Sequence, residues 1–356
     1  MKQSKWIKLL ALLMVATLAF AGCGGQEPAE EAPETNGEET TEAPDEDLVS
    51  VEWIANSVWP QNNHHSVGLN EFAEKLSEGT DGRVQLNVQV GGALGYDGPE
   101  LLRAVRDNLV PISDMLSSGV AGDEQIFEIV TLPFLVLDFD EARTLTNIAR
   151  PYFDEIAESK WNQKILYVAP WPAAGIWSQR EINSMEDMEG LRTRTYDRNG
   201  ALVMEAVGAT PYPLPFSEVY SSLATGVIDS VLTSSPTAVD ASFWEVLDYF
   251  APLSVTTATN MVTINLDEFN KLDSATQETV LSIAAEMEET MWANVAALDE
   301  EMRGIANENG IETLEPDAEF LSNLSDVTEE IRAEWLEEAP PEAQEILDEF
   351  YATIDR

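Results

Sequence analysis

The sequence predicts an α/β fold, and three observations lead to this prediction. Hydrophobic residues make up 44% of the 356 residues and aromatic residues 8%, which is enough apolar side chain for a buried core. Segments with alternating apolar residues, typical of strands, are interspersed with segments in which apolar residues recur at helical spacing. No repeat period typical of a solenoid is present. At about 100–200 residues per domain, the length allows two domains.

The elements follow from these patterns in order. Strands are expected at 51–58, 84–90, 112–116, 165–169, 191–196, 210–214, 227–232 and 261–266. Helices are expected around Leu69 to Leu76, at 99–108, at 140–161, near 199–207 and near 217–225. The 99–108 helix begins with Pro99, a residue favoured in the first turn.

A long helix is expected at 274–309. Gly304 is the only Gly or Pro within it, and Gly310 follows as a stop signal. At 1.5 Å per residue it would be about 50 Å long, more than a typical domain width, so we expect it to span two domains. Residues 50–172 with about 255–295 would form domain I, and 173–254 with about 296–356 domain II. The Pro- and Trp-rich segment 170–175 would be the crossing between them.

The balance of charge excludes one class of function. The chain has 19 Lys and Arg against 65 Asp and Glu, a net charge of −46, whereas phosphate contacts need clustered Lys and Arg. We therefore expect no nucleic-acid partner. Such an excess of carboxylates is tolerated where external cations screen it, which indicates a saline or alkaline habitat.

Two residue types are too scarce for several kinds of site. Cys23 is the only cysteine, which excludes an intramolecular disulfide and a thiolate metal cluster. His64 and His65 are the only histidines, so a catalytic triad or a histidine-rich metal site has almost nothing to use. We expect no catalytic residue, no cofactor and no metal.

The N-terminus carries an export signal. Three lysines lie within residues 1–8, residues 9–22 are uncharged and almost wholly apolar, and the run stops at Cys23. Fourteen residues suit a signal peptide and are too few to span about 30 Å of hydrocarbon. The sequence Phe-Ala-Gly-Cys at 20–23 resembles a lipoprotein lipobox, which implies cleavage after residue 22 and lipidation of Cys23. A plain signal peptide with an incidental cysteine is the alternative.

An acidic tether is expected at 23–49. Residues 26–47 hold ten carboxylates and no cation, a composition that cannot offset its ordering entropy by burial. The folded part would thus be exported and lipid-anchored at the outer face of the cell membrane or in the periplasm.

Several longer stretches carry a family resemblance. They are Gly-Gly-Ala-Leu-Gly at 91–95, Thr-Leu-Pro-Phe-Leu at 131–135, Asn-Ser-Met-Glu-Asp-Met-Glu-Gly-Leu-Arg-Thr-Arg-Thr at 183–195, Gly-Ala-Thr-Pro at 208–211, Pro-Phe-Ser-Glu-Val-Tyr-Ser-Ser-Leu-Ala-Thr-Gly-Val-Ile-Asp at 215–229 and Phe-Trp-Glu-Val-Leu-Asp-Tyr-Phe at 243–250. In this order, through nearly all of residues 50–350, they resemble the DctP family, the solute-binding proteins of tripartite ATP-independent periplasmic (TRAP) transporters.

The resemblance implies a fold and a function. The fold is of the periplasmic-binding-protein type (type II-like), with two α/β domains, a long helix spanning both and a ligand cleft between them. The function is that of a receptor and not an enzyme: it binds a small organic carboxylate and delivers it to the small and large TRAP membrane subunits. An ABC-type or signalling receptor of the same fold is an alternative. A carboxylate-pair hydrolase is less favoured, because 65 acids make candidate pairs uninformative.

Arg194 is the ligand-binding residue that the resemblance implies, since the family places a carboxylate-clamping arginine at this position. A guanidinium pairs bidentately with a carboxylate. Arg192 would lie on the same face of a strand, so periodicity cannot separate the two; family position leaves Arg192 as a supporting charge. A structural ion pair is the alternative role for Arg194. Many family members have an Asn-containing element where this chain has Thr233 and Ser234, so neither sialic-acid nor C4-dicarboxylate specificity is carried over.

Other candidates come from aromatic and polar residues near the expected cleft. Trp59 and Trp171 would stack against an aromatic or extended apolar organic acid, and Phe134 would line or brace the cleft. Core packing is the alternative for each. Asn63 and His64 open the first helix, where they would receive an anion or act as a cap.

Overall fold

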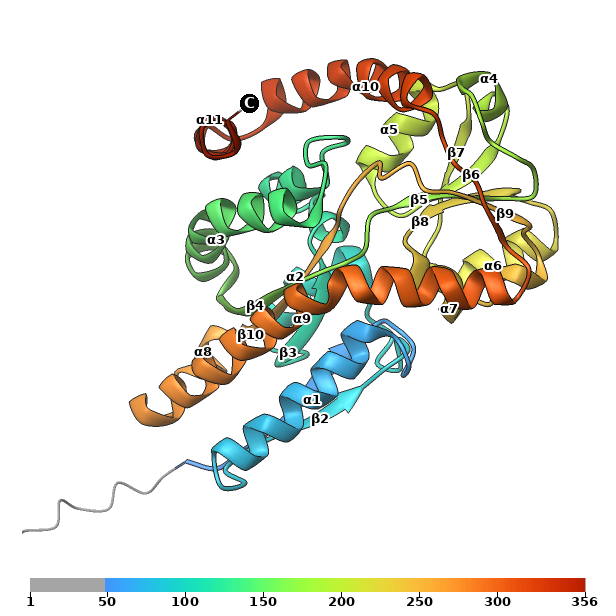
Figure 1. Cartoon of the computed structure of the whole chain (residues 1–356). Helices are drawn as coiled ribbons and strands as arrows, with labels where there is room; N and C mark the ends of the chain where they lie inside the picture. Colours follow the sequence, from blue (N-terminus) through green and yellow to red (C-terminus); the bar gives the residue numbers. More distant parts are fainter. Residues whose placement is uncertain (1–48, 356) are drawn as a thin grey trace, which may run out of the picture. The chain divides into compact units, whose positions relative to one another are not determined.

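Two β-sheets form the framework of residues 49–355, the part of the chain that the computed structural model describes (Figure 1). The first sheet has the strand order β2-β1-β3-β10-β4 and the second β11-β9-β5-β8-β6-β7. Each contains both parallel and antiparallel pairs. The predicted α/β class is confirmed. The predicted signal peptide, Cys23 and the tether up to residue 48 lie outside the described residues.

The first sheet consists of β1 (Val51–Ser57), β2 (Val84–Gln89), β3 (Ile112–Leu116), β4 (Gln163–Pro170) and β10 (Thr259–Asn265). The second consists of β5 (Gly175–Ser178), β6 (Arg192–Thr195), β7 (Thr210–Pro213), β8 (Ser230–Thr233), β9 (Tyr249–Ala251) and β11 (Glu312–Thr313). The helices are α1 (His64–Gly79), α2 (Leu101–Arg106), α3 (Phe139–Trp161), α4 (Met185–Met188), α5 (Arg198–Ala206), α6 (Phe216–Ala224), α7 (Ser235–Asp240), α8 (Leu266–Phe269), α9 (Ser274–Glu308), α10 (Ala318–Glu338) and α11 (Glu342–Ile354). We call the first sheet with α1, α2 and α3 the first lobe, and the second sheet with α4, α5, α6 and α7 the second lobe.

Local sequence sets several element boundaries. The predicted helix at 99–108 is shorter in the structure, because a 3₁₀ turn (Gly98–Glu100) precedes α2 and Asn108 has a φ of 54° that ends it. The predicted strand at 261–266 shifts to β10, since the Asn265 side chain accepts a hydrogen bond from the backbone N–H of Glu268 and thereby caps α8.

The long helix α9 runs past both lobes, as predicted (Figure 1). Its first half packs against α1 and the first sheet through Val280, Ala284 and Met287. Near its other end, Ala306 belongs to the apolar cluster around Trp177 of the second sheet. Because one helix contributes to the apolar cores of both lobes, it braces them.

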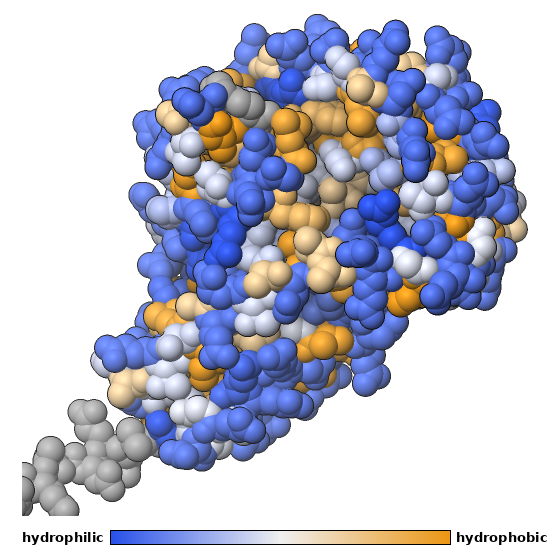
Figure 2. Space-filling model, viewed as in Figure 1, coloured by the Kyte–Doolittle hydropathy of each residue, from blue (hydrophilic) through white to orange (hydrophobic). Residues whose placement is uncertain are grey.

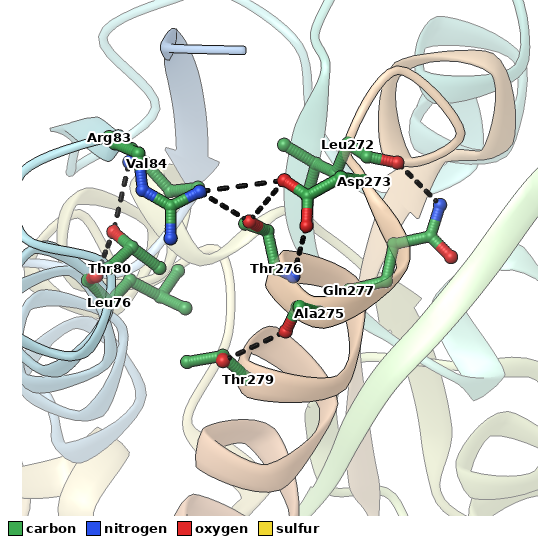
Figure 3. A network of polar contacts seen from close by, with 10 residues as sticks. All are labelled: Leu76, Thr80, Arg83, Val84, Leu272, Asp273, Ala275, Thr276, Gln277 and Thr279. Atoms are coloured by element: carbon green, nitrogen blue, oxygen red, sulfur yellow. Dashed lines mark hydrogen bonds and ion pairs between the residues drawn. The ribbon is translucent and has the colours of Figure 1, made fainter. Parts of the chain in front are cut away.

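Polar contacts fix the beginning of α9 to the first lobe (Figure 3). The Asp273 side chain caps the helix by accepting a hydrogen bond from the backbone N–H of Thr276 at 3.0 Å. Arg83, which precedes β2, donates from Nη1 to the Thr276 hydroxyl at 2.6 Å and lies 3.5 Å from a carboxylate oxygen of Asp273. The start of the long helix and the turn before β2 are thus held together.

Two connecting segments cross between the lobes side by side. The backbone N–H of Trp171 donates to the Ala258 carbonyl, that of Ala174 to the Thr256 carbonyl, and that of Val255 to the Ala174 carbonyl, all at 2.8–2.9 Å. The crossing predicted at 170–175 is therefore half of a short antiparallel ladder. This ladder places Trp171 at the boundary between the lobes.

The C-terminal helices differ from the predicted domain grouping. Helix α10 packs against α5 of the second lobe, whereas α11 packs against α3 of the first. The apolar face of α11, with Ile346, Leu347 and Phe350, joins Phe153 in the core of the first lobe. Grouping all of 296–356 with the second domain therefore needs correction for α11. In the described part no helix has both the length and the apolar character to cross a membrane.

Polar and apolar residues are distributed differently between the visible face and the interior. On the face that Figure 2 shows, hydrophilic residues occupy most of the surface, with apolar residues scattered among them. The large apolar side chains are instead gathered in the buried clusters of the two lobes.

Candidate functional site

A cavity lies where the two lobes and the crossing segments meet. It holds about 400 Å³ of empty space, the open solvent at its mouth included. Its walls are mostly apolar and aromatic, with a few polar groups. The lining residues are Trp59, Leu116, Trp171, Pro172, Ala174, Arg194, Tyr196, Phe216, Thr233, Ser234, Thr237 and Ala258.

Arg194, on β6, is the only charged residue of this lining. It is 5% exposed, and its Nε donates to the Leu214 carbonyl at 3.0 Å. None of the ion pairs among residues 49–355 includes it. Burial lowers its pKa to about 10, against the opposing effect of Tyr196 and Asp197, so the guanidinium is still protonated at neutral pH. It is a buried cation whose terminal nitrogens are available for an anion.

Arg192 has a different environment, although it lies on the same strand. Its side chain is 41% exposed and pairs with Asp229 at 3.0 Å. Its Nη1 also donates to the Gly226 carbonyl. The structure therefore separates the two arginines that periodicity could not, and gives Arg192 a supporting role at the edge of the second lobe.

Aromatic rings from both lobes and from the crossing segment form one wall of the cavity. Trp59 follows β1 and contacts Trp171 edge-on, with ring centroids 4.7 Å apart. Phe216, at the start of α6, lies edge-on to Trp59 at 6.2 Å. The Trp171 indole N–H donates to the Asn260 side chain at 2.7 Å. Asn260 is not a lining residue, so this bond holds the N–H edge of the indole on the side away from the cavity. Such a wall favours a ligand with a flat or apolar face.

Three hydroxyl residues supply the neutral polar groups of the cavity. Thr233 ends β8, Ser234 is the N-cap residue of α7, and Thr237 lies in the first turn of α7; all three are buried. The hydroxyls of Ser234 and Thr237 lie 3.3 Å apart. Hydroxyls donate and accept, so this side of the cavity can satisfy a carbonyl or an N–H group of a ligand.

Five of the eight predicted ligand-binding residues line the cavity, namely Arg194, Trp59, Trp171, Thr233 and Ser234. Their contact with a ligand stays a prediction. The other three are Phe134, Asn63 and His64. Phe134 has a φ of 52° and packs against the core of the second lobe.

Asn63 and His64 have structural partners instead of facing the cavity. Asn63 caps α1, accepting from the backbone N–H of His65, and its amide donates to Asp240 of the second lobe at 2.6 Å. The Nε2 of His64 is 3.3 Å from the Pro170 carbonyl. Burial lowers the pKa of His64 to about 4, so the imidazole is neutral at physiological pH and offers no positive charge to an anion.

Sequence reasoning missed Tyr196, Phe216 and Thr237 as lining residues. Two signals could have found the first two. Tyr196 follows Arg194 by two residues and so shares its side of the chain, and Phe216 lies within the 215–229 stretch that carries the resemblance. Thr237 is brought to the cavity only by the path of α7.

A buried carboxyl lies behind the aromatic wall and allows a prediction. Burial raises the pKa of Asp114 to about 7, against hydrogen bonds such as that from Asn260. A folded pKa above the unfolded one means that ionisation costs stability as pH rises from about 4 through 7. The difference in melting temperature between Asp114→Asn and the wild type should therefore be about 2–4 °C more in favour of the variant at pH 8 than at pH 5. Melting curves at both pH values test this, and an equal difference at the two would contradict it.

The comparisons with known proteins agree with this geometry. The family described as bacterial extracellular solute-binding protein, family 7 (DctP), matches residues 55–339. The chain belongs to this family. The resemblance predicted from the sequence is confirmed, and the protein is an extracytoplasmic solute receptor and not an enzyme. The carboxylate-pair hydrolase is thereby excluded.

Two solved structures of this receptor family are similar over the whole folded part. They are DctP7 and DctP6 of Bordetella pertussis, extracytoplasmic solute receptors binding pyroglutamic acid. Both have a TM-score of 0.82; they are 26% and 28% identical to this chain and cover 85% of it, and 99% and 100% of their own chains are covered.

A curated relative is matched over less of its length. It is a solute-binding protein of Chromohalobacter salexigens, 25% identical over 206 residues. The match covers 56% of this chain and 60% of the relative, so this chain spans less than two thirds of the relative's length.

Proposed function

We propose that this receptor binds a compact cyclic monocarboxylate, with pyroglutamate as the representative, and delivers it to the membrane subunits of a TRAP transporter. The observation that carries the proposal is the lone charge of the cavity: Arg194 is cationic, and no other lining residue is charged. One carboxylate neutralises one guanidinium. A buried site that holds a single unpaired cation therefore favours a ligand of net charge −1.

The rest of the lining favours a small ring. Trp59, Trp171 and Phe216 offer apolar faces, and Ser234 and Thr237 can bond the N–H or carbonyl of a lactam. That two receptors of the same fold at 26% and 28% identity bind pyroglutamic acid supports this choice.

Other acids fit the same lining less well. A dicarboxylate would bury a second negative charge for which the cavity lining has no second cation. A uronate carries a row of hydroxyls, whereas most of the lining is apolar or aromatic. An amino acid such as proline has the ring and the carboxylate, but its ammonium would find no carboxylate in the lining.

Calorimetry and thermal shift test the proposal. L-pyroglutamate should bind and, at about 100 times its dissociation constant, stabilise the folded state by about 2.7 kcal/mol. L-proline is the matched control because it has the same ring with a cationic nitrogen, and succinate and glucuronate represent the other two classes. Tighter binding of any of these three than of L-pyroglutamate would refute the proposed ligand class.

We also propose that Cys23 is lipidated and anchors the receptor to the membrane. The support is the lipobox-like sequence at 20–23, which lies outside the described residues. Replacing Cys23 by Ser should abolish incorporation of fatty acid and release the protein from the membrane, because no other thiol exists in the chain. Metabolic labelling with a fatty acid followed by fractionation measures both effects. Unchanged labelling of Cys23→Ser would contradict the anchor.

A further inference from the structure

A buried carboxylate is connected to the cavity wall through one amide. The Nδ2 of Asn260, on β10, donates to Asp114 Oδ1, on β3, at 2.8 Å. The Oδ1 of the same amide accepts the indole N–H of Trp171 at 2.7 Å. Asp114 and Asn260 are 0% exposed, and neither belongs to the cavity lining. The hydrogen-bonded chain Asp114–Asn260–Trp171 thus reaches the cavity wall at its last member. The side chains of Trp59, another lining residue, and Ser57 also lie beside Asp114 and lower its pKa.

The chemistry of the three groups allows one direction of this chain. Above its pKa the Asp114 carboxylate only accepts hydrogen bonds, and an indole N–H only donates at any pH. The amide must therefore present its NH₂ to Asp114 and its oxygen to Trp171. A flipped amide would put oxygen against carboxylate and NH₂ against N–H, losing both bonds inside a buried region where unpaired polar groups are costly. Asp114 thus selects the orientation of Asn260, and Asn260 fixes the edge of the indole.

The sheet holds the first two members rigidly. β3 and β10 are antiparallel neighbours, with Asn260 opposite Leu116 and Val262 opposite Asp114. Trp171 lies on a less regular segment, the crossing after β4. Its other ring contacts are with His64, His65 and Trp59, at centroid distances of 4.4–4.7 Å. These packing contacts restrict the ring, but a directional bond to a rigid sheet residue fixes which edge faces the cavity.

We propose that Asp114 and Asn260 are positioning residues for ligand binding: they hold Trp171 in the orientation that forms the aromatic wall, and so set affinity for a ring-shaped acid. The proposal rests on the proposed function for its binding readout. Its structural readout, the state of the Trp171 indole N–H, does not depend on the ligand.

Two substitutions of Asp114 separate positioning from stability. Asp114→Leu keeps the approximate shape, and exchanging a buried charge for an apolar group is often neutral or stabilising. It removes the acceptor, so Asn260 is no longer oriented, and L-pyroglutamate binding should weaken about five- to tenfold. Asp114→Asn keeps an acceptor oxygen at this position and should bind within about threefold of the wild type.

A charge swap provides the second test, and it remains informative if Asp114→Leu fails to fold. Asn260→Asp places a second carboxylate against Asp114, which raises the pKa of the pair further, so binding should weaken at a pH high enough to ionise both groups. The double variant Asp114→Asn with Asn260→Asp restores the chain, because the new amide donates to the new carboxylate, which accepts the Trp171 N–H. Affinity should return to within about threefold of the wild type. A role in packing alone predicts no such rescue.

The measurements are calorimetry with L-pyroglutamate and proton–nitrogen NMR of the indole N–H groups. The Trp171 resonance is the one lost in Trp171→Phe. It should shift in Asp114→Leu and Asn260→Asp and return to near its wild-type position in the double variant. Unchanged affinity and resonance in Asp114→Leu, or no recovery in the double variant, would overturn the positioning role. If the wild type does not bind L-pyroglutamate, the proposed ligand is wrong, and the NMR series still decides the role of Asp114 and Asn260.

Discussion

Replacing Arg194 by Ala is expected to weaken ligand binding about 30-fold to several thousand-fold. Truncating one partner of a buried hydrogen-bonded charge pair costs about 2–5 kcal/mol, and each 1.4 kcal/mol is about tenfold in affinity. The structure supports the upper part of this range, because Arg194 is 5% exposed and has no ion-pair partner in the described part of the chain. Without it, the ligand carboxylate would be buried against aromatic and hydroxyl groups alone.

Two matched variants show whether geometry or charge alone matters. Arg194→Lys should recover only part of the affinity, since an ammonium cannot reproduce the two-pronged pairing of a guanidinium with a carboxylate. Arg192→Ala removes a charge two residues away that is 41% exposed and paired with Asp229, so its effect on affinity should be small. Titration calorimetry with L-pyroglutamate gives all three values. Wild-type affinity in a folded Arg194→Ala protein would exclude the carboxylate clamp.

The elements that the sequence predicted well are those with a strong local pattern. Strand β3 coincides with the predicted 112–116, and the long helix differs by one residue at its end, since a segment almost free of Gly and Pro offers no other place to stop. By contrast, β5 (Gly175–Ser178) was not predicted. It has four residues, all buried, so there is no alternation to detect.

The candidate site was predictable only in part, for a related reason. Arg194, Trp59 and Trp171 stand out by residue type and by family position. Asn260 and Asp114 do not, because their contact joins residues 146 apart in the sequence. Only the pairing of β3 with β10 brings them together, and no local pattern encodes that pairing. For the same reason periodicity could not separate Arg192 from Arg194, whose difference in burial arises from what packs around β6.

Replacing Gly175 by Ala is expected to destabilise the folded protein by about 3 kcal/mol, a typical upper value for forcing extra atoms into a packed interior. Gly175 begins β5, directly after the crossing segment that carries Trp171 and Ala174. A methyl group there would meet the Ala251 carbonyl oxygen of the neighbouring strand β9 and lie 2.6 Å from the Phe250 ring. The backbone oxygen cannot rotate away as a side chain can, so the strands would have to separate.

Gly304 provides the matched control, with the opposite sign. It lies inside α9, and a methyl group added there would meet nothing within 4 Å. Ala is better than Gly in a helix interior by about 0.8–1.0 kcal/mol, so Gly304→Ala should be stabilising where Gly175→Ala is destabilising. Chemical denaturation of both variants measures the two free energies of unfolding. Similar values would mean that any replacement of a glycine has this cost, and that the close approach of β9 to Gly175 is not its cause.

The same two variants should differ in ligand binding. Because β5 continues the segment that carries Trp171, a separation of β5 from β9 should weaken ligand binding, whereas Gly304→Ala should leave binding unchanged.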